Sequence, residues 1–287
     1  MVARAKGKST VTVGIQGSGT PIEAEYRKVD EALVRCATLV TTFDARAYER
    51  RAVEAARQCW TLRMAAEHRS TVVFAQLASQ LFEANATLDA KLVMLRMAQD
   101  EVRHTETCGQ VLIALGAPPA CVFDRHVRPL ARHAGCTPEE RALRNVIYTT
   151  CMSEMVAVAR LVDEIEATRD PLLRDAARRL LADEVLHGQF GFFYLEAWRP
   201  WLDAHRGVLR SLERYLRHAF AVIEVALAPP IAVPPPLTAD ERALGLPDVA
   251  RGREIFYSAM EEAIVPGLER FGIEAGTAWR RRKIAAA

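Results

Sequence analysis

Two near-identical pentapeptides carry most of the information in this sequence of 287 residues: DEVRH at Asp100–His104 and DEVLH at Asp183–His187. Each lies in a stretch that is predicted to be helical. A glutamate and a histidine three positions apart share one helix face, so each pentapeptide can present both side chains to one metal site. A Glu-x-x-His pair alone is a weak signal, because it also arises by chance in a chain rich in acidic residues.

A glutamate on the preceding predicted helix accompanies each pentapeptide. Glu67 lies 34 residues before Glu101, and Glu154 lies 30 residues before Glu184. Both fall on apolar helix faces, so all four carboxylates are predicted to point inward. Unpaired buried carboxylates cost several kcal/mol, so cations must balance them. We therefore predict a site for two metal ions, with a set of buried ion pairs as the alternative.

Two neighbouring residues are weaker candidates for this site. Glu83 lies only 18 residues before Glu101, which is too close for two antiparallel helices to return to the same level. His68 points about 100° away from Glu67 on a helix, so it is predicted to pack against the protein or lie at the surface. Glu67 is therefore the preferred first ligand.

Apolar periodicity and helix-boundary signals predict five long helices and a short helical region near the C-terminus. Gly116 and two prolines end the second helix, while Thr137-Pro138 and Asp170-Pro171 begin the third and fourth. No strand-like alternation of useful length is found. The fold class is predicted to be all-α, a four-helix bundle with additional peripheral helices. The predicted ranges are 45–85, 88–115, 137–168, 170–198 and 208–227, and Pro200 is predicted to interrupt or bend the fourth helix at its end.

The chain divides into three predicted parts. Residues 1–44 form an N-terminal arm and a short leading helix, and residues 45–227 form the helical bundle with the metal site. Residues 228–287 form a proline-rich strap and a C-terminal helix that packs on the bundle. Residues 1–25 are rich in Gly, Ser and Thr, so they are predicted to be flexible or loosely docked and to carry no chemistry.

Composition excludes several classes of protein. The 38 basic and 36 acidic residues nearly cancel, so no global field recruits nucleic acid or an anionic membrane. The six cysteines are widely spaced and form no CxxC pair, which favours a reduced cytoplasmic setting and excludes a rubredoxin-like module. Neither a signal sequence nor a membrane-spanning stretch is evident, so we expect a soluble protein.

The ligand pattern resembles that of the ferritin-like di-iron carboxylate superfamily over residues 45–200. The resemblance implies two iron ions, or iron with manganese, and dioxygen as co-substrate. It also resembles bacterial multicomponent monooxygenases in the Asp before each Glu-x-x-His, which implies that Asp100 orients His187 and that Asp183 orients His104. The six implied metal ligands are Glu67, Glu101, His104, Glu154, Glu184 and His187.

The resemblance is not uniform across the superfamily. Cys108 stands where radical-generating ribonucleotide reductase subunits carry a Tyr, so a tyrosyl radical is not expected. The ligand spacing is similar to that of the 4-aminobenzoate N-oxygenase group, but Leu180 stands where that group has a seventh ligand, a His. A related small-molecule oxygenase remains the prediction.

Apolar and aromatic residues near the carboxylates are predicted to hold an organic substrate, or simply to fill the core of a wide bundle. Gly188 and Gly191 either open a cavity there or allow close helix packing. The candidate substrate-pocket residues are Cys108, Thr150, Cys151, Phe190 and Tyr194.

The leading hypothesis is an oxidoreductase, a non-haem di-iron monooxygenase that activates dioxygen to hydroxylate or N-oxygenate a small organic molecule, for example in a biosynthetic pathway. It implies an external electron donor, a ferredoxin or a reductase, with a homodimer as a possible assembly. One alternative is a ferroxidase or another iron-handling ferritin-like protein. Another is a tRNA-modifying di-iron hydroxylase, which the basic runs at Arg125–Arg132 and Arg280–Lys283 support only weakly.

Overall fold

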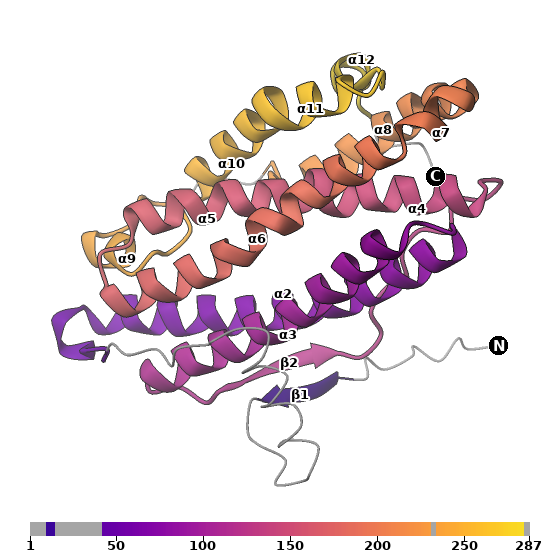
Figure 1. Cartoon of the computed structure of the whole chain (residues 1–287). Helices are drawn as coiled ribbons and strands as arrows, with labels where there is room; N and C mark the ends of the chain where they lie inside the picture. The colour runs from indigo at the N-terminus through magenta and orange to yellow at the C-terminus, as the bar shows by residue number, and fades with distance from the viewer. Residues whose placement is uncertain (1–9, 15–41, 231–233, 284–287) are drawn as a thin grey trace, which may run out of the picture.

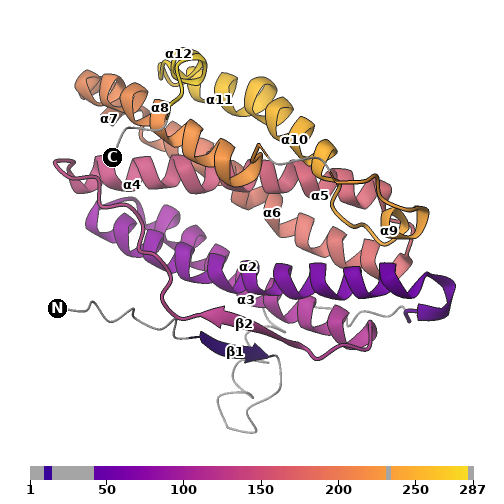
Figure 2. The same ribbon diagram turned by 180° about the vertical axis from the view of Figure 1, so that it is seen from behind.

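The computed structural model describes residues 10–14, 42–230 and 234–283. The predicted leading helix before residue 45 lies outside the described residues, as does most of the predicted arm. Four long helices form the centre of the fold, which confirms the all-α prediction. They pack as two antiparallel pairs, and Figures 1 and 2 show these pairs from opposite sides. The first pair is α2 (Arg50–Glu83) with α3 (Leu88–Ala114), and the second joins α4–α5 (from Pro138 to Ala167) with α6 (Pro171–Ala197).

Local sequence sets the helix boundaries as predicted. Thr137 accepts a hydrogen bond from the backbone N–H of Glu140, and Pro138 occupies the first turn of α4 (Pro138–Val146). Asp170 accepts hydrogen bonds from the N–H groups at the start of α6, again before a proline. Gly116 follows α3 with φ 70°, a left-handed conformation that glycine adopts without steric cost.

The third long helix is not a regular α-helix throughout. Between α4 and α5 (Met155–Ala167) lies a π-helical segment, η2 (Ile147–Glu154), and Glu154 is its last residue. Apolar periodicity along the chain did not predict this segment. A π segment changes the rotation of the helix relative to regular α-geometry, and such segments often occur at functional sites. The direction of the Glu154 side chain therefore depends on η2.

The hydrophobic core has two parts. One part lies between the first halves of α2 and α6 and the second half of α3, and includes Trp60, Met64 and Leu112. The other lies at the opposite end and includes Phe74, Met97 and Phe190. The candidate ligands on α2, α3 and α6 fall between these two parts in sequence, so a polar layer interrupts the apolar interior.

Shorter helices cover the α4–α6 side of the bundle (Figure 1). Pro200 lies in the first turn of α7 (Arg199–Ala204), which follows α6 after a bend at Trp198. The predicted fifth helix corresponds to α8 (Arg206–Leu227). After it the chain forms several short elements, of which α12 packs on α8 and α10 packs on α5. These short elements are α9 (Ala239–Ala243), α10 (Val249–Ser258), the π-helical η3 (Ala259–Ile264), α11 (Val265–Glu269) and α12 (Ala275–Arg280).

A two-stranded antiparallel sheet lies on the opposite side of the bundle, below α2 and α3 in Figure 1. Strand β1 (Thr10–Gly14) pairs with β2 (Ala120–Asp124), and β2 contacts α2. The expectation that no useful strand exists was therefore wrong, and part of the predicted arm is ordered as a strand. Among the described residues, none of the helices combines the length and the apolar character that crossing a membrane requires.

Candidate metal centre

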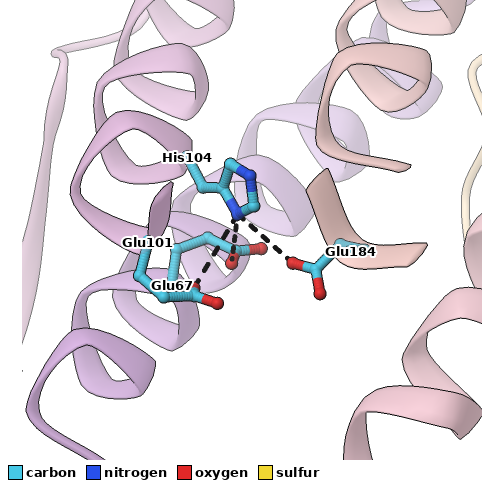
Figure 3. Close-up of side chains that lie close together, drawn as sticks. All are labelled: Glu67, Glu101, His104 and Glu184. Atoms are coloured by element: carbon cyan, nitrogen blue, oxygen red, sulfur yellow. Dashed lines mark ion pairs between the residues drawn. The ribbon is translucent and has the colours of Figure 1, made fainter. Parts of the chain in front are cut away.

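The structure brings all six candidate ligands together at the polar layer of the bundle. They form two groups that share Glu184: one also contains Glu67, Glu101 and His104, and the other also contains Glu154 and His187. Within each group the donor atoms lie within 4.8 Å of one another. The first group is drawn in Figure 3, where side chains from α2, α3 and α6 converge.

His104 directs its Nδ1 atom at three carboxylates (Figure 3). The Nδ1 atom lies 3.2 Å from Oε1 of Glu184, 3.6 Å from Oε2 of Glu67 and 3.8 Å from Oε2 of Glu101. The imidazole is 2% exposed, so water does not compete for these contacts. Three oxygens and one nitrogen thus surround one small volume.

His187 directs its Nδ1 atom at two of these three carboxylates, those of Glu184 and Glu101. This atom lies 3.1 Å from Oε2 of Glu184 and 3.2 Å from Oε1 of Glu101. Each of these glutamates therefore turns one oxygen toward His104 and the other toward His187. In such an arrangement two carboxylates can each contact two cations, while Glu67 and Glu154 each serve one side.

The second ring nitrogen of each imidazole, Nε2, lies next to an aspartate. His187 Nε2 lies 3.3 Å from Oδ2 of Asp100, and His104 Nε2 lies 3.4 Å from Oδ2 of Asp183. Each aspartate reaches across to the histidine of the other pentapeptide, in the cross-wise pairing that the resemblance implied. An Nε2–H donated to a carboxylate leaves the Nδ1 lone pair directed into the cluster, where it can bind a metal.

Arg103, which was not among the residues predicted for the site, links the two aspartates. Its Nη2 group donates hydrogen bonds to Oδ1 of Asp100 and, at 3.1 Å, to Oδ2 of Asp183. The guanidinium is buried, with 8% of its side chain exposed. Leu186 occupies the corresponding position in the second pentapeptide. This difference between DEVRH and DEVLH was the one sign in the sequence that Arg103 has a specific role.

Protons balance part of the negative charge in the protein alone. Burial lowers the pKa of both imidazoles, but their contacts with the surrounding carboxylates outweigh this effect. The pKa of His187 rises to about 12, and the pKa of His104 rises well above its usual value. A metal ion requires neutral imidazoles, so binding must release these protons.

The outer carboxylates are also affected by burial. Burial raises the pKa of Glu67 to about 7, against the contact with His104 that lowers it. Burial and the negative charges of Glu184 and Glu101 raise the pKa of Glu154 well above its usual value. Both shifts reflect excess negative charge in a water-poor layer.

Several buried polar atoms in this cluster make no hydrogen bond to a described residue. They are both carboxylate oxygens of Glu101 and both ring nitrogens of His104. A buried polar atom without a hydrogen bond costs about 1–3 kcal/mol. Metal coordination would satisfy the inward-facing atoms, so the residues present fit a metal centre. Mixed carboxylate and imidazole donors suit iron and manganese, whereas thiophilic metals prefer cysteine.

Two alternatives considered from the sequence do not belong to this cluster. The Glu83 side chain is half exposed and pairs with Arg141 at 3.0 Å. The His68 ring packs edge-on against Phe123, with ring centroids 4.5 Å apart. The preference for Glu67 over Glu83 and the packing role predicted for His68 are therefore consistent with the structure.

A cavity of about 680 Å³ reaches the carboxylates from the side of α2 and α5. Glu67, Glu101, Glu154 and Glu184 all line it. None of the five side chains predicted to line a substrate pocket lines this cavity. All five are buried in the interior of the bundle: Cys108, Thr150, Cys151, Phe190 and Tyr194.

The two glycines near these residues serve close packing. A Cβ atom at Gly191 would lie 2.3 Å from both Sγ of Cys151 and Oγ1 of Thr150. A Cβ atom at Gly188 would lie 3.0 Å from Sδ of Met155. Gly191 therefore lets α6 approach η2 closely, and of the two readings of these glycines the structure favours packing over an open cavity.

Comparison with protein-family models found no match, and comparison with curated proteins found none either. The class of site consequently follows from its geometry alone: a buried carboxylate and histidine cluster in an all-α protein that is suited to hold metal ions.

Proposed function

We propose that this protein is a di-iron carboxylate oxygenase that uses dioxygen to hydroxylate or N-oxygenate a small organic substrate. The observation that carries this proposal is the arrangement of Glu101 and Glu184, each with one oxygen toward each imidazole. Two ions held side by side by shared carboxylates suit the two-electron chemistry of oxygen activation. The resemblance of the ligand pattern to di-iron carboxylate proteins supports the same assignment.

The iron ions would supply the reduction of dioxygen, and the chain would supply placement. Glu67, Glu101 and His104 would hold one ion, while Glu154 and His187 would hold the other, with Glu184 between them. Asp100 and Asp183 would keep each Nε2 protonated and each Nδ1 free to bind. For a hydroxylation, one oxygen atom enters the substrate and the other leaves as water, with two electrons and two protons supplied from outside. An external ferredoxin or reductase is the proposed electron source.

The cavity supports a small-molecule substrate. Its volume of about 680 Å³ falls within the range of about 300–1,000 Å³ that is usual for ligand pockets. The basic C-terminal run gives little support to RNA binding, because Arg282 is engaged within the protein. Its guanidinium pairs with Glu224 at 2.7 Å and lies 3.7 Å above the ring of Trp279.

The test is an anaerobic Fe(II) titration of the full chain followed by exposure to dioxygen. We expect about two iron ions per chain and an absorption change that requires both iron and oxygen. A protein that binds no iron, or whose spectrum does not respond to oxygen, contradicts the proposal. Repeated turnover of excess Fe(II) into a mineral core would favour the iron-handling alternative instead.

A further inference from the structure

A row of aromatic rings leads away from the candidate metal centre along α6. The row begins three residues after His187 and continues at steps of three or four residues, which places its rings on one face of the helix. It passes the bend at Trp198 and ends after α7, at one end of the molecule (Figure 1). The residues of this aromatic row, in order, are Phe190, Tyr194, Trp198, Trp201 and His205.

Each ring of the row contacts the next. The ring centroids of Phe190 and Tyr194 lie 6.1 Å apart, and those of Tyr194 and Trp198 lie 5.4 Å apart, with both pairs stacked. The rings of Trp198 and Trp201 meet edge to face at 5.2 Å, and the ring of His205 stacks on Trp201 at 4.4 Å. Centroid separations of about 4.5–7 Å are typical of aromatic pairs in direct contact. The row is therefore an unbroken series of ring contacts.

The row differs from ordinary core packing because it leaves the core. Phe190 and Tyr194 are buried. Trp198 and Trp201 are half-buried, and His205 is exposed. The Nδ1 atom of His205 donates a hydrogen bond of 2.7 Å to the backbone carbonyl of Trp201, which keeps the last two rings together. Rings that only fill a core need no such continuation to the surface, so the row connects the buried centre with solvent.

The four tryptophans of the chain differ in their charged neighbours. The guanidinium of Arg63 lies 4.6 Å from the centre of the Trp60 ring, and that of Arg282 lies 3.7 Å from the centre of the Trp279 ring. A cation over an indole opposes the removal of an electron, because the oxidised ring is also positive. Within the described residues no arginine or lysine lies over either tryptophan of the row. By this criterion the two tryptophans of the row are the easier ones to oxidise.

Tyr194 is a contact in the row and not a stable place for a radical. Oxidation of a phenol releases its proton to a base, but within the described part of the chain the buried hydroxyl of Tyr194 has no hydrogen-bond partner. An indole can lose an electron and keep its proton, so Trp198 is the first place where an electron deficiency can reside. It lies eleven residues after His187, about 16 Å along a helix, and the rings of Phe190 and Tyr194 occupy the interval.

We infer that the aromatic row is a protective route that delivers electrons from a small thiol to the metal centre after dioxygen has oxidised it without a substrate. The inference rests on the proposed function, which supplies the oxidised centre. Trp198 gives one electron to the centre, and Trp201 then gives one electron to Trp198. An oxidised centre without this route would take electrons from its own ligands and their neighbours, whereas the row moves the electron deficiency to the surface.

Electrons and protons balance along this route. Each passage removes one electron from the indole of Trp201, and because this residue is half-buried at the surface, its N–H proton passes to water. A thiol then transfers one hydrogen atom, an electron with a proton, to the Trp201 radical and restores the indole. The thiol becomes a thiyl radical, and two thiyl radicals form one disulfide. Two electrons therefore reach the centre for each disulfide made.

The experiment mixes the iron-loaded full chain with dioxygen in the absence of substrate and freezes samples for electron paramagnetic resonance. We expect a tryptophan radical that glutathione removes. Without glutathione, peptide mass spectrometry should find oxidation products at Trp198 and Trp201. Trp198→Phe should abolish both the radical and the products at Trp201, because a phenyl ring is much harder to oxidise than an indole.

Trp60→Phe and Trp279→Phe are the matched controls, because each removes one tryptophan outside the row. Both should keep the radical and the oxidation products. Trp201→Phe provides a second reading if Trp198→Phe does not fold, which circular dichroism checks. In Trp201→Phe the radical should remain at Trp198, and glutathione should remove it more slowly than in the unaltered protein.

Three outcomes overturn the inference: no tryptophan radical forms, the radical disappears in Trp60→Phe, or Trp198→Phe keeps the oxidation at Trp201. Iron content and the change in iron absorption with oxygen are measured on the same samples. A chain that binds iron and responds to oxygen but forms no tryptophan radical contradicts this inference and leaves the proposed function standing.

A chain that holds no iron contradicts the proposed function, and the row is then tested in the metal-free protein. A light flash generates a ruthenium(III) tris-bipyridine oxidant in solution, which attacks the row from the surface. Oxidation products should appear at Trp198 and Trp201, and Trp201→Phe should sharply reduce those at Trp198. Unchanged products at Trp198 would show that the two rings are not connected and would overturn the route as well.

Discussion

The two helix pairs contribute the same kinds of donor to the cluster but hold them on different backbones. Glu67 projects from a regular stretch of α2, whereas Glu154 ends the π-helical segment η2. The first pentapeptide carries Arg103 between the aspartates, and the second carries Leu186. The donor side chains of the cluster are therefore nearly symmetric, whereas the helices and neighbouring residues that hold them are not. Two glutamates can occupy equivalent positions on different kinds of helix, because only the direction of each side chain at the metal site has to match.

The largest expected effect comes from removing a donor that both halves share. Glu184 belongs to both groups of donors, so Glu184→Ala should reduce bound iron from about two ions per chain to nearly none. Glu67→Ala and Glu154→Ala should each lose about one ion, since each serves a single side. Elemental analysis of iron-loaded protein measures this. Glu83→Ala, at an exposed ion pair, is the control, and a Glu184→Ala protein with full iron content would contradict the shared role.

Metal removal tests whether the cluster as a whole is held together by cations. A metal that binds only the folded state adds about 4 kcal/mol of stability at a thousandfold excess over its Kd. We expect chelation to lower the Tm by roughly 10 °C, because about 2–4 °C accompany each kcal/mol in a chain of this size. Differential scanning calorimetry gives the shift. The same chelation should hardly change the Tm of Glu184→Ala, and an equal shift in both proteins would argue against this site as the origin.

Arg103→Leu tests the clearest difference between the two pentapeptides. It leaves the carboxylates of Asp100 and Asp183 without their shared donor, and loss of one partner from a buried pair costs about 3–5 kcal/mol. We expect the free energy of unfolding in urea to fall by about 3 kcal/mol. Arg96→Leu is the control, because Arg96 is half exposed and lies 3.8 Å from Asp100. If both substitutions lowered the free energy of unfolding equally, the result would contradict a specific role of Arg103.

The pH dependence of metal binding compares the two histidines. Their pKa values are raised in the metal-free protein, to about 12 for His187, so both are protonated at neutral pH. Binding of two Mn(II) ions displaces both protons, so the overall affinity for the pair of ions should rise by about a hundredfold or more per pH unit between pH 6 and pH 8. Chelator competition measures this slope. His104→Gln and His187→Gln should each reduce the slope by about tenfold per pH unit, and an unchanged slope would contradict the protonated state.

The smallest effect concerns the backbone of η2. Gly191→Ala introduces a Cβ atom 2.3 Å from Cys151 and Thr150, so η2 or α6 must shift. Overpacking of this kind costs about 1–3 kcal/mol, and a displaced η2 would also change the direction of Glu154. Gly207→Ala in α8 is the control, because a Cβ atom there meets nothing within 4 Å. Thermal unfolding distinguishes them, and a Gly191→Ala protein as stable as Gly207→Ala would show that the contact is readily relieved.

The helices and the convergence of the six candidate ligands were predictable because they depend on local pattern. Pro138 and Pro171 mark helix starts, and the spacing of Glu101 and His104 fixes a common face. The π segment was not predictable from apolar periodicity, and it packs closely against Gly191 of another helix. The side from which the cavity reaches the cluster was also not predicted. The residues predicted as pocket walls lie near the ligands in sequence but point into the core, while the cavity is lined from α2 and α5.

The sheet was missed for a different reason. Val11 and Val13 do alternate with threonine in β1, but a single five-residue strand is a weak signal until its partner is known. That partner lies more than a hundred residues later in the chain, where Val122 and Phe123 oppose β1. Pairing at such separation depends on the bundle that positions β2 and not on local sequence.

This separation also has a consequence for synthesis. At about 5–20 residues per second, β1 leaves the ribosome roughly 5–20 seconds before β2 exists. Throughout that interval both of its edges carry unpaired N–H and C=O groups, which can pair with any other extended chain. The strand that begins the described structure therefore cannot be paired until α2, α3 and β2 have been made, and the nascent chain must keep it available for that time.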